Sequence, residues 1–312
     1  MARLAFLFPG QGSQFPGMGR DLVAAFPEAR AVYDRADAAL APFHLSISRV
    51  SFDGTEEELK RTAVTQPAIL VHSLAVFEVL KARGLAPALL AGHSLGEWSA
   101  LVAAGALTLE DAVVLVHRRG TFMQEAVAAG QGAMGAVIGL DGPSVAAACA
   151  ETEAATGETV SAANFNSPEQ TVIAGTANAV AKASELLKQK GAKRVLPLPV
   201  SAPFHCALMK PAEEKLSPFL DAAAFADFEV PVVTNVDVLA NLSGAGARES
   251  LRRQVCSPVR WVETVERLSR DAEGAVEVGP GTVLAGLAKR IAKEWPVRTT
   301  SDAEGIGRLL AG

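Results

Sequence analysis

The chain has 312 residues, 49% of them hydrophobic, which suits one large domain with a smaller insertion and a sizeable buried core. Its net charge of −5 argues against a general nucleic-acid binder. The three cysteines, Cys149, Cys206 and Cys256, have neither metal-ligand nor disulfide-framework spacing. The apolar start is too short for a signal peptide, and we find no apolar segment of membrane-spanning length. We therefore expect a cytoplasmic protein that contacts neither nucleic acid nor membrane.

The first 130 residues alternate between strand and helix patterns. Residues 4–8 form an apolar strand, which runs into the glycine-bearing loop 9–14. A second short strand at 87–91 leads into a helix that begins near Glu97. Further helical patterns lie at 18–40, at 56–62, at 66–83 with an amphipathic pattern, and from Thr108 to about Ala129. Thr55 with Glu58, and Thr108 with Asp111, have the spacing of helix-capping pairs.

Residues 131–199 have a pattern of their own. The predicted strands are 132–140, 159–164, 170–174 and 193–198, and the predicted helices are 142–150 and 177–190. This β-α-β-β-α-β order is that of a ferredoxin-like module. A strand at 230–235, helices at 247–256 and 258–270, a strand at 275–278 and a helix to about Lys293 follow. We predict an α/β fold: an α/β-hydrolase-like core with a parallel sheet, from residues 1–130 and 200–312, and an inserted ferredoxin-like subdomain, 131–199.

The most informative motif is Gly92-His93-Ser94-Leu95-Gly96. A strand, a serine between glycines and then a helix is the context of a nucleophile elbow. The glycines let the backbone turn sharply without Cβ clashes, so the hydroxyl of Ser94 projects at a helix N-terminus. Ser94 is therefore the candidate nucleophile.

A serine needs a neighbour that takes its proton, and histidine is the usual one near neutral pH. His44 lies in a helix-ending loop, His72 and His117 lie within helices, and His93 adjoins the serine and points away from it. His205 is the remaining candidate for the base, and it lies in a proline-bearing loop. Its position alone does not assign it that role. No histidine follows His205, and no carboxylate partner for it is evident. This differs from α/β-hydrolases, in which the acid follows the serine and the histidine comes last in the chain. A backbone carbonyl is the alternative support for the imidazole.

At this point the chain resembles the malonyl-CoA:acyl-carrier-protein transacylases of fatty-acid synthesis and the related acyltransferase domains of polyketide synthases. The resemblance runs almost end to end. It covers, besides the elbow with Glu97, the segments Phe8–Gln14, Thr65–Ala68, Arg119-Gly120, Met123-Gln124, Asn164–Pro168, His205–Met209, Thr234–Val236, Gln254 and Glu277–Gly281.

The resemblance implies a role for each matching residue. Ser94 is the acyl-accepting nucleophile, His205 its general base and acid, and the backbone N–H groups of Gln11 and Leu95 the oxyanion hole. Arg119 binds the malonyl carboxylate, which is chemically sensible because a guanidinium grips a carboxylate with two parallel hydrogen bonds.

Two further positions follow from the same resemblance. The backbone near Gln254 supports the histidine, and the bulky Phe204 before His205 points to malonyl rather than α-methylmalonyl units. The implied substrates are malonyl-CoA and acyl carrier protein, with a malonyl-serine intermediate and no metal or bound cofactor.

Two other functions remain open from the sequence. A serine thioesterase or esterase could use the same pair of residues to release free malonate. A catalytically silent subunit that binds carrier protein is the second alternative. The pathway supplied, the oligomeric state and the docking surface do not follow from the motifs.

Overall fold

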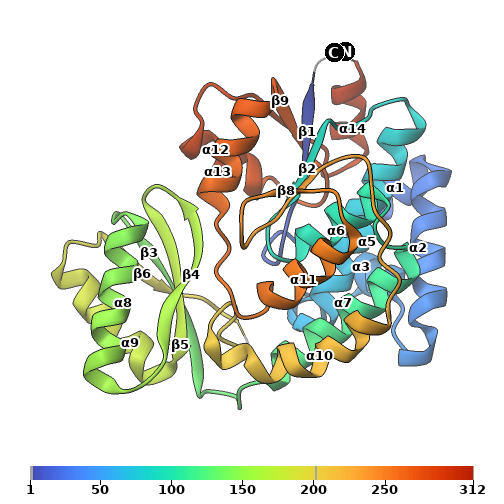
Figure 1. Ribbon diagram of the computed structural model, residues 1–312. Coiled ribbons are helices and arrows are strands. Elements are labelled where there is room, and N and C mark those ends of the chain that lie inside the picture. Colours follow the sequence, from blue (N-terminus) through green and yellow to red (C-terminus); the bar gives the residue numbers. More distant parts are fainter. Residues whose placement is uncertain (1–2, 201, 312) are drawn as a thin grey trace.

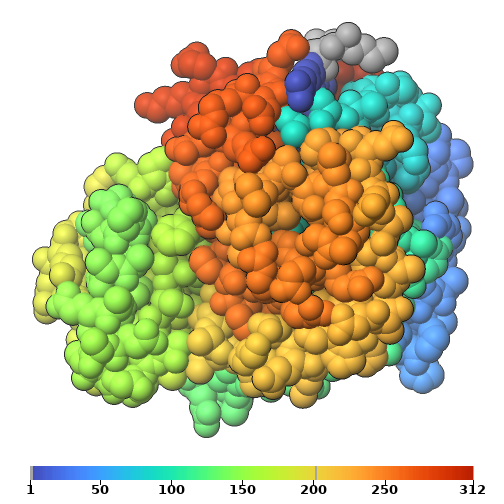
Figure 2. Space-filling model, in the orientation of Figure 1, coloured from blue at the N-terminus to red at the C-terminus, as the bar shows by residue number. Residues whose placement is uncertain are grey.

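The computed structural model describes residues 3–200 and 202–311, and it contains two separate β-sheets. Figure 1 shows the larger sheet among the blue, cyan and orange helices, and the smaller sheet in the green and yellow unit beside them. In the space-filling view the two units lie against each other (Figure 2). The predicted α/β class with an inserted ferredoxin-like unit is confirmed.

The larger sheet has six strands in the order β10-β9-β1-β2-β7-β8. The neighbours from β10 to β7 are parallel, and only β8 runs antiparallel, against β7. The strands are β1 (Leu4–Phe8), β2 (Leu89–Gly92), β7 (Val232–Val233), β8 (Ala240–Asn241), β9 (Gly274–Glu277) and β10 (Val297–Thr299). The N-terminal strand therefore lies at the centre of the sheet, between β2 and β9.

Helices cover both faces of this sheet, as a parallel sheet requires. Along β1, Phe6 and Phe8 join the larger apolar core, whereas Ala5 and Leu7 join a second core on the other face. The helices of this unit are α1 (Arg20–Ala25), α2 (Pro27–Leu40), α3 (Ile47–Asp53), α4 (Glu56–Lys60), α5 (Thr62–Ala82), α6 (Leu95–Ala104), α7 (Leu109–Glu125), α10 (Lys210–Ala222), α11 (Gly244–Gln254), α12 (Trp261–Asp271), α13 (Val283–Ile291) and α14 (Ala303–Leu310).

The structure corrects several local predictions. The helix predicted at 18–40 is two helices, because Phe26 takes an extended conformation before Pro27. The short elements α3, α14, β8 and β10 were not predicted. The caps at Thr55 and Thr108 are confirmed, since each side chain accepts a hydrogen bond from the backbone three residues later.

The helix α5 differs most from its prediction. It is not amphipathic, because it is buried on nearly every side, including polar residues such as Gln66 and His72. The statement that no segment reaches membrane-spanning length is also wrong, since the 21 residues of α5 are long and apolar enough to do so. In this fold 94% of its most apolar stretch is buried inside the protein, which is typical of a core helix.

The smaller sheet is antiparallel, with the order β4-β5-β3-β6. Its strands are β3 (Gly132–Ile138), β4 (Val160–Ser167), β5 (Gln170–Thr176) and β6 (Arg194–Pro197), and its helices are α8 (Gly142–Thr156) and α9 (Ala177–Gln189). The two helices and the sheet enclose an apolar core of their own. All these elements fall between residues 131 and 199, and the domain boundaries themselves stay a prediction.

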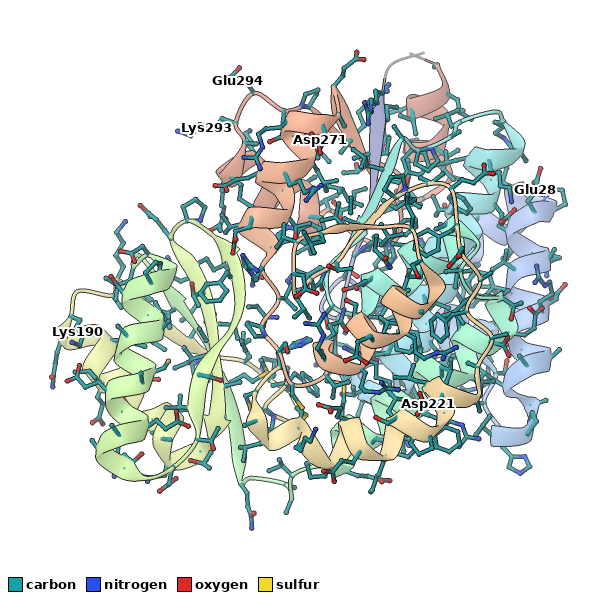
Figure 3. The ribbon with its side chains drawn as sticks, viewed as in Figure 1. Glu28, Lys190, Asp221, Asp271, Lys293 and Glu294 are labelled. Carbon is teal, nitrogen blue, oxygen red and sulfur yellow. The ribbon has the colours of Figure 1, made fainter. Side chains whose placement is uncertain are left out.

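In Figure 3 the charged side chains of Lys190, Lys293 and Glu294 lie at the periphery and point outward. Lys190 pairs there with Glu151 at 2.9 Å, and both side chains are largely exposed. Such surface pairs contribute little to stability.

Candidate active site

Ser94 lies on a sharp turn between β2 and α6. Its backbone has φ 50° and ψ −104°, a conformation that a non-glycine residue rarely adopts. The two flanking glycines are needed for close approach: a Cβ on Gly92 would lie 1.9 Å from the carbonyl carbon of Gly96. A Cβ on Gly96 would lie 1.9 Å from the carbonyl oxygen of Phe8. The turn thus packs tightly against the end of β1, which holds the serine at the carboxyl ends of the central strands.

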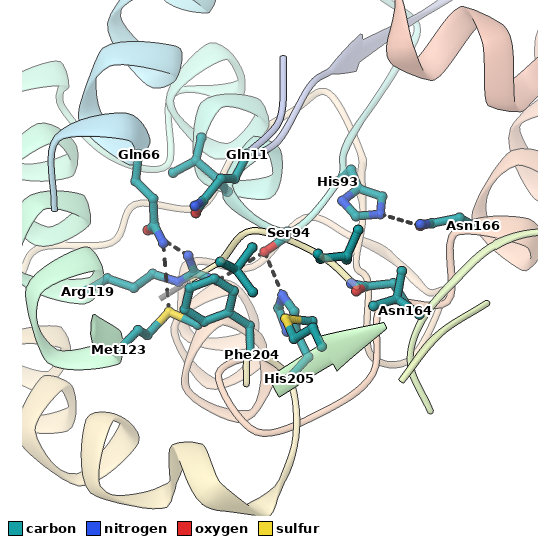
Figure 4. A pocket seen from close by; sticks show the side chains of 15 residues that line it. Gln11, Gln66, His93, Ser94, Arg119, Met123, Asn164, Asn166, Phe204 and His205 are labelled. Atoms are coloured by element: carbon teal, nitrogen blue, oxygen red, sulfur yellow. Dashed lines mark hydrogen bonds between the residues drawn. The ribbon is translucent and has the colours of Figure 1, made fainter. Parts of the chain in front are cut away.

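His205 lies 111 positions further along the chain, and its Nε2 is 2.7 Å from Ser94 Oγ (Figure 4). Its other ring nitrogen, Nδ1, donates to the backbone carbonyl of Gln254 at 2.9 Å. That bond places the ring proton on Nδ1 and leaves Nε2 free to accept the hydroxyl proton of Ser94. His205 itself has a positive φ of 59°. Ser201, in the same predicted loop, lies outside the described residues.

Burial and, to a smaller extent, the positive charge of Arg119 lower the pKa of His205 to about 3, although the bond to Gln254 acts in the opposite direction. The imidazole is therefore neutral at neutral pH. A neutral imidazole is the form that can take a proton from a serine.

Arg119 extends from α7 and is 1% exposed. Its guanidinium donates to Gln66 Oε1 at 2.7 Å, to Gln254 Oε1 at 3.1 Å and to Ser94 Oγ at 3.2 Å. Burial lowers the pKa of Arg119 to about 10, and Glu97 opposes this shift. The side chain therefore stays cationic at neutral pH. A buried cation next to the serine is suited to binding an anionic group of a substrate.

The loop after β1 lies beside the elbow. β1 and β2 are parallel neighbours, with Phe8 paired to Gly92, so both chains leave the sheet at the same edge. The approach is close, because a Cβ on Gly10 would lie 2.5 Å from the carbonyl oxygen of His93. Gln11 and Leu95 both line the cavity at Ser94. Within the described chain, neither of their backbone N–H groups has a hydrogen-bond acceptor.

The cavity is lined by both units of the molecule (Figure 4). The larger unit and the connecting loop contribute Gln11, Gln66, His93, Ser94, Leu95, Arg119, Met123, Val200, Phe204 and His205. The inserted unit and its exit contribute Met134, Asn164, Asn166, Val172 and Leu198. A backbone bridge between Asn164 and Val259 joins β4 to the larger unit.

The other histidines do not reach Ser94 Oγ. His93 donates to Asn166 Oδ1 at 2.8 Å and packs edge-on against Trp261, although it also lines the cavity. His72 is buried beside Ser301, and burial lowers its pKa to about 4. His117 bonds the carbonyl of Ala63.

Sequence reasoning missed a buried polar cluster behind the elbow. Glu97, Asn235 and Ser250 are at most 2% exposed, and the carboxylate of Glu97 accepts hydrogen bonds from Asn235, Ser250 and Gln254. An acidic residue within the apolar stretch after the elbow was the available signal. Arg118, the residue before Arg119, is half-buried, and its guanidinium lies over the ring of Phe219.

The comparisons with known proteins identify the family of this chain. Residues 5–310 match the family model described as the acyl transferase domain. The chain belongs to this acyltransferase family. It is 51% identical over 312 residues to the malonyl CoA-acyl carrier protein transacylase of Escherichia coli K12, covering 99% of both chains. It is 48% identical to the protein of that name from Bacillus subtilis 168, covering 98% of this chain and 96% of the relative.

Solved acyltransferase structures have the same fold. The acyl carrier protein S-malonyltransferase of Vibrio cholerae superposes with a TM-score of 0.95 at 46% identity, over 99% of this chain and 100% of the other. A malonyl-transacylase in complex with its type II PKS acyl-carrier protein gives a TM-score of 0.95 at 46% identity, over 99% of both chains. The resemblance drawn from the motifs is therefore confirmed.

Proposed function

We propose that this protein transfers the malonyl group of malonyl-CoA to the phosphopantetheine thiol of acyl carrier protein, through a malonyl-serine intermediate. One observation carries the proposal: Ser94 Oγ lies 2.7 Å from His205 Nε2 and 3.2 Å from the guanidinium of the buried Arg119. A base and an anion-binding group thus converge on one nucleophile. The names of the relatives support the same assignment.

In the first half-reaction His205 Nε2 accepts the proton of Ser94 as Oγ attacks the thioester carbon. The oxyanion that forms accepts hydrogen bonds from the N–H groups of Gln11 and Leu95, each worth about 3 kcal/mol in the transition state. The oxyanion then collapses, the C–S bond breaks, and the CoA sulfur takes the proton from His205. The acyl group stays on Ser94 as an ester.

The second half-reaction runs in the opposite sense through the same groups. The carrier-protein thiol passes its proton to His205 and attacks the ester carbonyl. The C–O bond breaks, Ser94 recovers its proton from His205, and the malonyl thioester leaves on the carrier protein. This alternation is a ping-pong cycle.

Arg119 selects the acyl group. Malonyl differs from acetyl by a terminal carboxylate, which replaces Ser94 Oγ as a partner of the guanidinium once the hydroxyl is acylated. Pairing with this carboxylate also offsets the charge of Arg119, so His205 becomes a stronger base when a malonyl group is bound. Substrate binding therefore favours the protonated imidazole that the reaction requires.

Phe204 is proposed to limit the size of the substituent on the α-carbon. Phe204 is 8% exposed and lines the cavity beside His205. Rates measured side by side with malonyl-, methylmalonyl- and acetyl-CoA test this assignment. Equal rates for malonyl- and methylmalonyl-CoA would contradict it. We also propose a cytoplasmic location, on the basis of these substrates.

The activity is tested by mixing the enzyme with malonyl-CoA and carrier protein bearing phosphopantetheine. Malonyl-carrier protein is the expected main product, and intact-protein mass spectrometry without the carrier should show one malonyl group on Ser94. Free malonate as the main product would indicate a thioesterase instead. An unmodified protein would favour a silent binding subunit.

A further inference from the structure

The buried carboxylate of Glu97 has no direct role in the cycle proposed above, yet it lies at the centre of the groups that carry it out. Glu97 is the third residue of α6 and is fully buried. Oε2 accepts from Gln254 Nε2 at 2.7 Å and from the backbone N–H of Asn235 at 3.0 Å. Oε1 accepts from Ser250 Oγ at 3.0 Å. The two groups bound to Oε2 can only donate, so this oxygen acts as an acceptor. Burial raises the pKa of the Glu97 carboxyl, and these hydrogen bonds oppose the rise.

Both residues bound to Oε2 hold the backbone of Ser94. Asn235 Oδ1 accepts from the N–H of Ser94 at 2.7 Å, and Gln254 Nε2 donates to its carbonyl at 3.1 Å. The strained turn at Ser94 is thus held on both sides by groups that share one carboxylate oxygen. Strained conformations persist only where the surroundings over-determine them.

Gln254 connects Glu97 to the two charged groups of the reaction. Its side-chain oxygen accepts from Arg119, while its backbone carbonyl accepts from His205. An amide side chain can flip, and its orientation is set by its neighbours. Because Glu97 accepts only from the NH₂ end, the oxygen end must face Arg119.

The result is a relay in which a neutral amide separates a buried carboxyl group from a buried cation. Among the described residues, Arg119 forms no ion pair with a carboxylate at 4.0 Å or less, although a buried charge needs compensation. A direct pair with Glu97 would occupy the guanidinium. The interposed Gln254 leaves it available for the substrate.

We infer that Glu97 is a positioning residue for malonyl selection: it fixes the orientation of the Gln254 amide and so aims Arg119 at the acyl group on Ser94. This inference rests on the proposed function. The acyl-acceptor serine and the histidine serve malonyl and acetyl groups alike, whereas Arg119 serves only malonyl. Loss of positioning therefore changes the ratio of the two rates.

The test compares kcat/KM for malonyl-CoA and acetyl-CoA in Glu97→Gln and in the unaltered enzyme. We expect the malonyl-to-acetyl ratio to fall about tenfold, the effect of weakening one charged hydrogen bond. This ratio does not depend on how much enzyme is folded. An unchanged or higher ratio would overturn the inference.

A matched control is Glu277→Gln, which alters another fully buried glutamate. Glu277 accepts from the N–H groups of Leu284 and Ala285, away from the relay. The malonyl-to-acetyl ratio of the Glu277→Gln variant should stay within about twofold of the ratio of the unaltered enzyme. A fall as large as that of Glu97→Gln would show that loss of any buried carboxylate suffices and would overturn the inference.

If Glu97→Gln does not fold, Gln254→Met decides. This change keeps the backbone carbonyl that accepts from His205 but removes the side-chain amide that contacts Glu97 and Arg119. The malonyl-to-acetyl ratio should therefore fall, and an unchanged ratio would overturn the inference. If Glu97→Gln folds, combining the two changes should lower the ratio no further than Gln254→Met alone. Failure of the proposed function is distinct, because the unaltered enzyme would then transfer no malonyl group.

Discussion

The two units contribute different things to one cavity. The parallel-sheet unit holds the proposed nucleophile Ser94, the buried cation Arg119 and the amide of Gln254, at the edge where β1, β2 and β7 end. The inserted antiparallel unit contributes a wall, including Met134, Asn164 and Asn166. Ligands in open α/β sheets bind at the carboxyl ends of parallel strands, because chains from several strands converge there. The chemistry is thus concentrated in one unit, while the other shapes access to it.

The sharpest test of this division is Ser94→Ala. Without the hydroxyl no acyl-enzyme forms, so the transfer rate should fall by about 10⁴-fold or more. Intact-protein mass spectrometry after exposure to malonyl-CoA checks this result. A malonyl adduct that persists in the variant would place the nucleophile elsewhere.

The next largest effect is expected for Arg119→Ala. Removing the guanidinium deletes a charged hydrogen-bond donor, worth about 1.5–3 kcal/mol, so the preference for malonyl over acetyl should fall by one to two orders of magnitude. Competition between malonyl-CoA and acetyl-CoA for the same enzyme measures it. Arg118→Ala is the matched control, since the guanidinium of Arg118 lies over the ring of Phe219 rather than facing the serine. An unchanged preference in Arg119→Ala would contradict the carboxylate-binding role.

Asn166→Ala tests how much the inserted unit contributes to the activity. It removes the acceptor of the His93 ring nitrogen, a bond between the two units, and leaves the groups around Ser94 in place. A neutral hydrogen bond contributes about 0.5–1.5 kcal/mol, so kcat/KM should fall no more than about tenfold. Steady-state kinetics with malonyl-CoA checks this. A loss as large as that of Ser94→Ala would mean that the inserted unit takes part in the chemistry.

The smallest expected effect is that of pH. The folded pKa of His205 is about 3, so the imidazole stays neutral as pH falls from 8 to 6. An ordinary histidine, with a pKa of about 6.5, would lose most of its neutral form over this range. We therefore expect kcat/KM for acyl-enzyme formation to lack an inflection near 6.5. Stopped-flow measurement of CoA release checks it, and a clear inflection there would contradict the burial of a neutral base.

Local patterns predicted much of the fold. Strand β1 and both helix caps follow from short-range rules, and the elbow is visible in five consecutive residues. The elements that were missed are short, such as β8 and β10, which exist because they pair with neighbouring strands. The character of α5 was also missed, because only its neighbours determine that its polar residues are buried.

The site was predictable to the extent that a motif carried it. Ser94 follows from its own neighbours in the sequence, but the residues alone left the role of His205 open. Its support by a backbone carbonyl was anticipated as a possibility, and the structure places the carbonyl of Gln254 there. The role that we propose for Glu97 could not be predicted, since its partners Asn235 and Gln254 lie more than 130 positions away.

The central place of β1 has a consequence for biosynthesis. One edge of this strand pairs with β2, but the other edge pairs with β9, at residues 274–277, which is synthesised much later. A growing polypeptide therefore keeps an apolar strand edge uncovered until most of the chain has left the ribosome. Such an edge is a template for pairing with other chains. A newly made chain should therefore benefit from chaperone protection until β9 has been synthesised. The inserted unit should not need this protection, because all its strands lie within one continuous segment of the sequence.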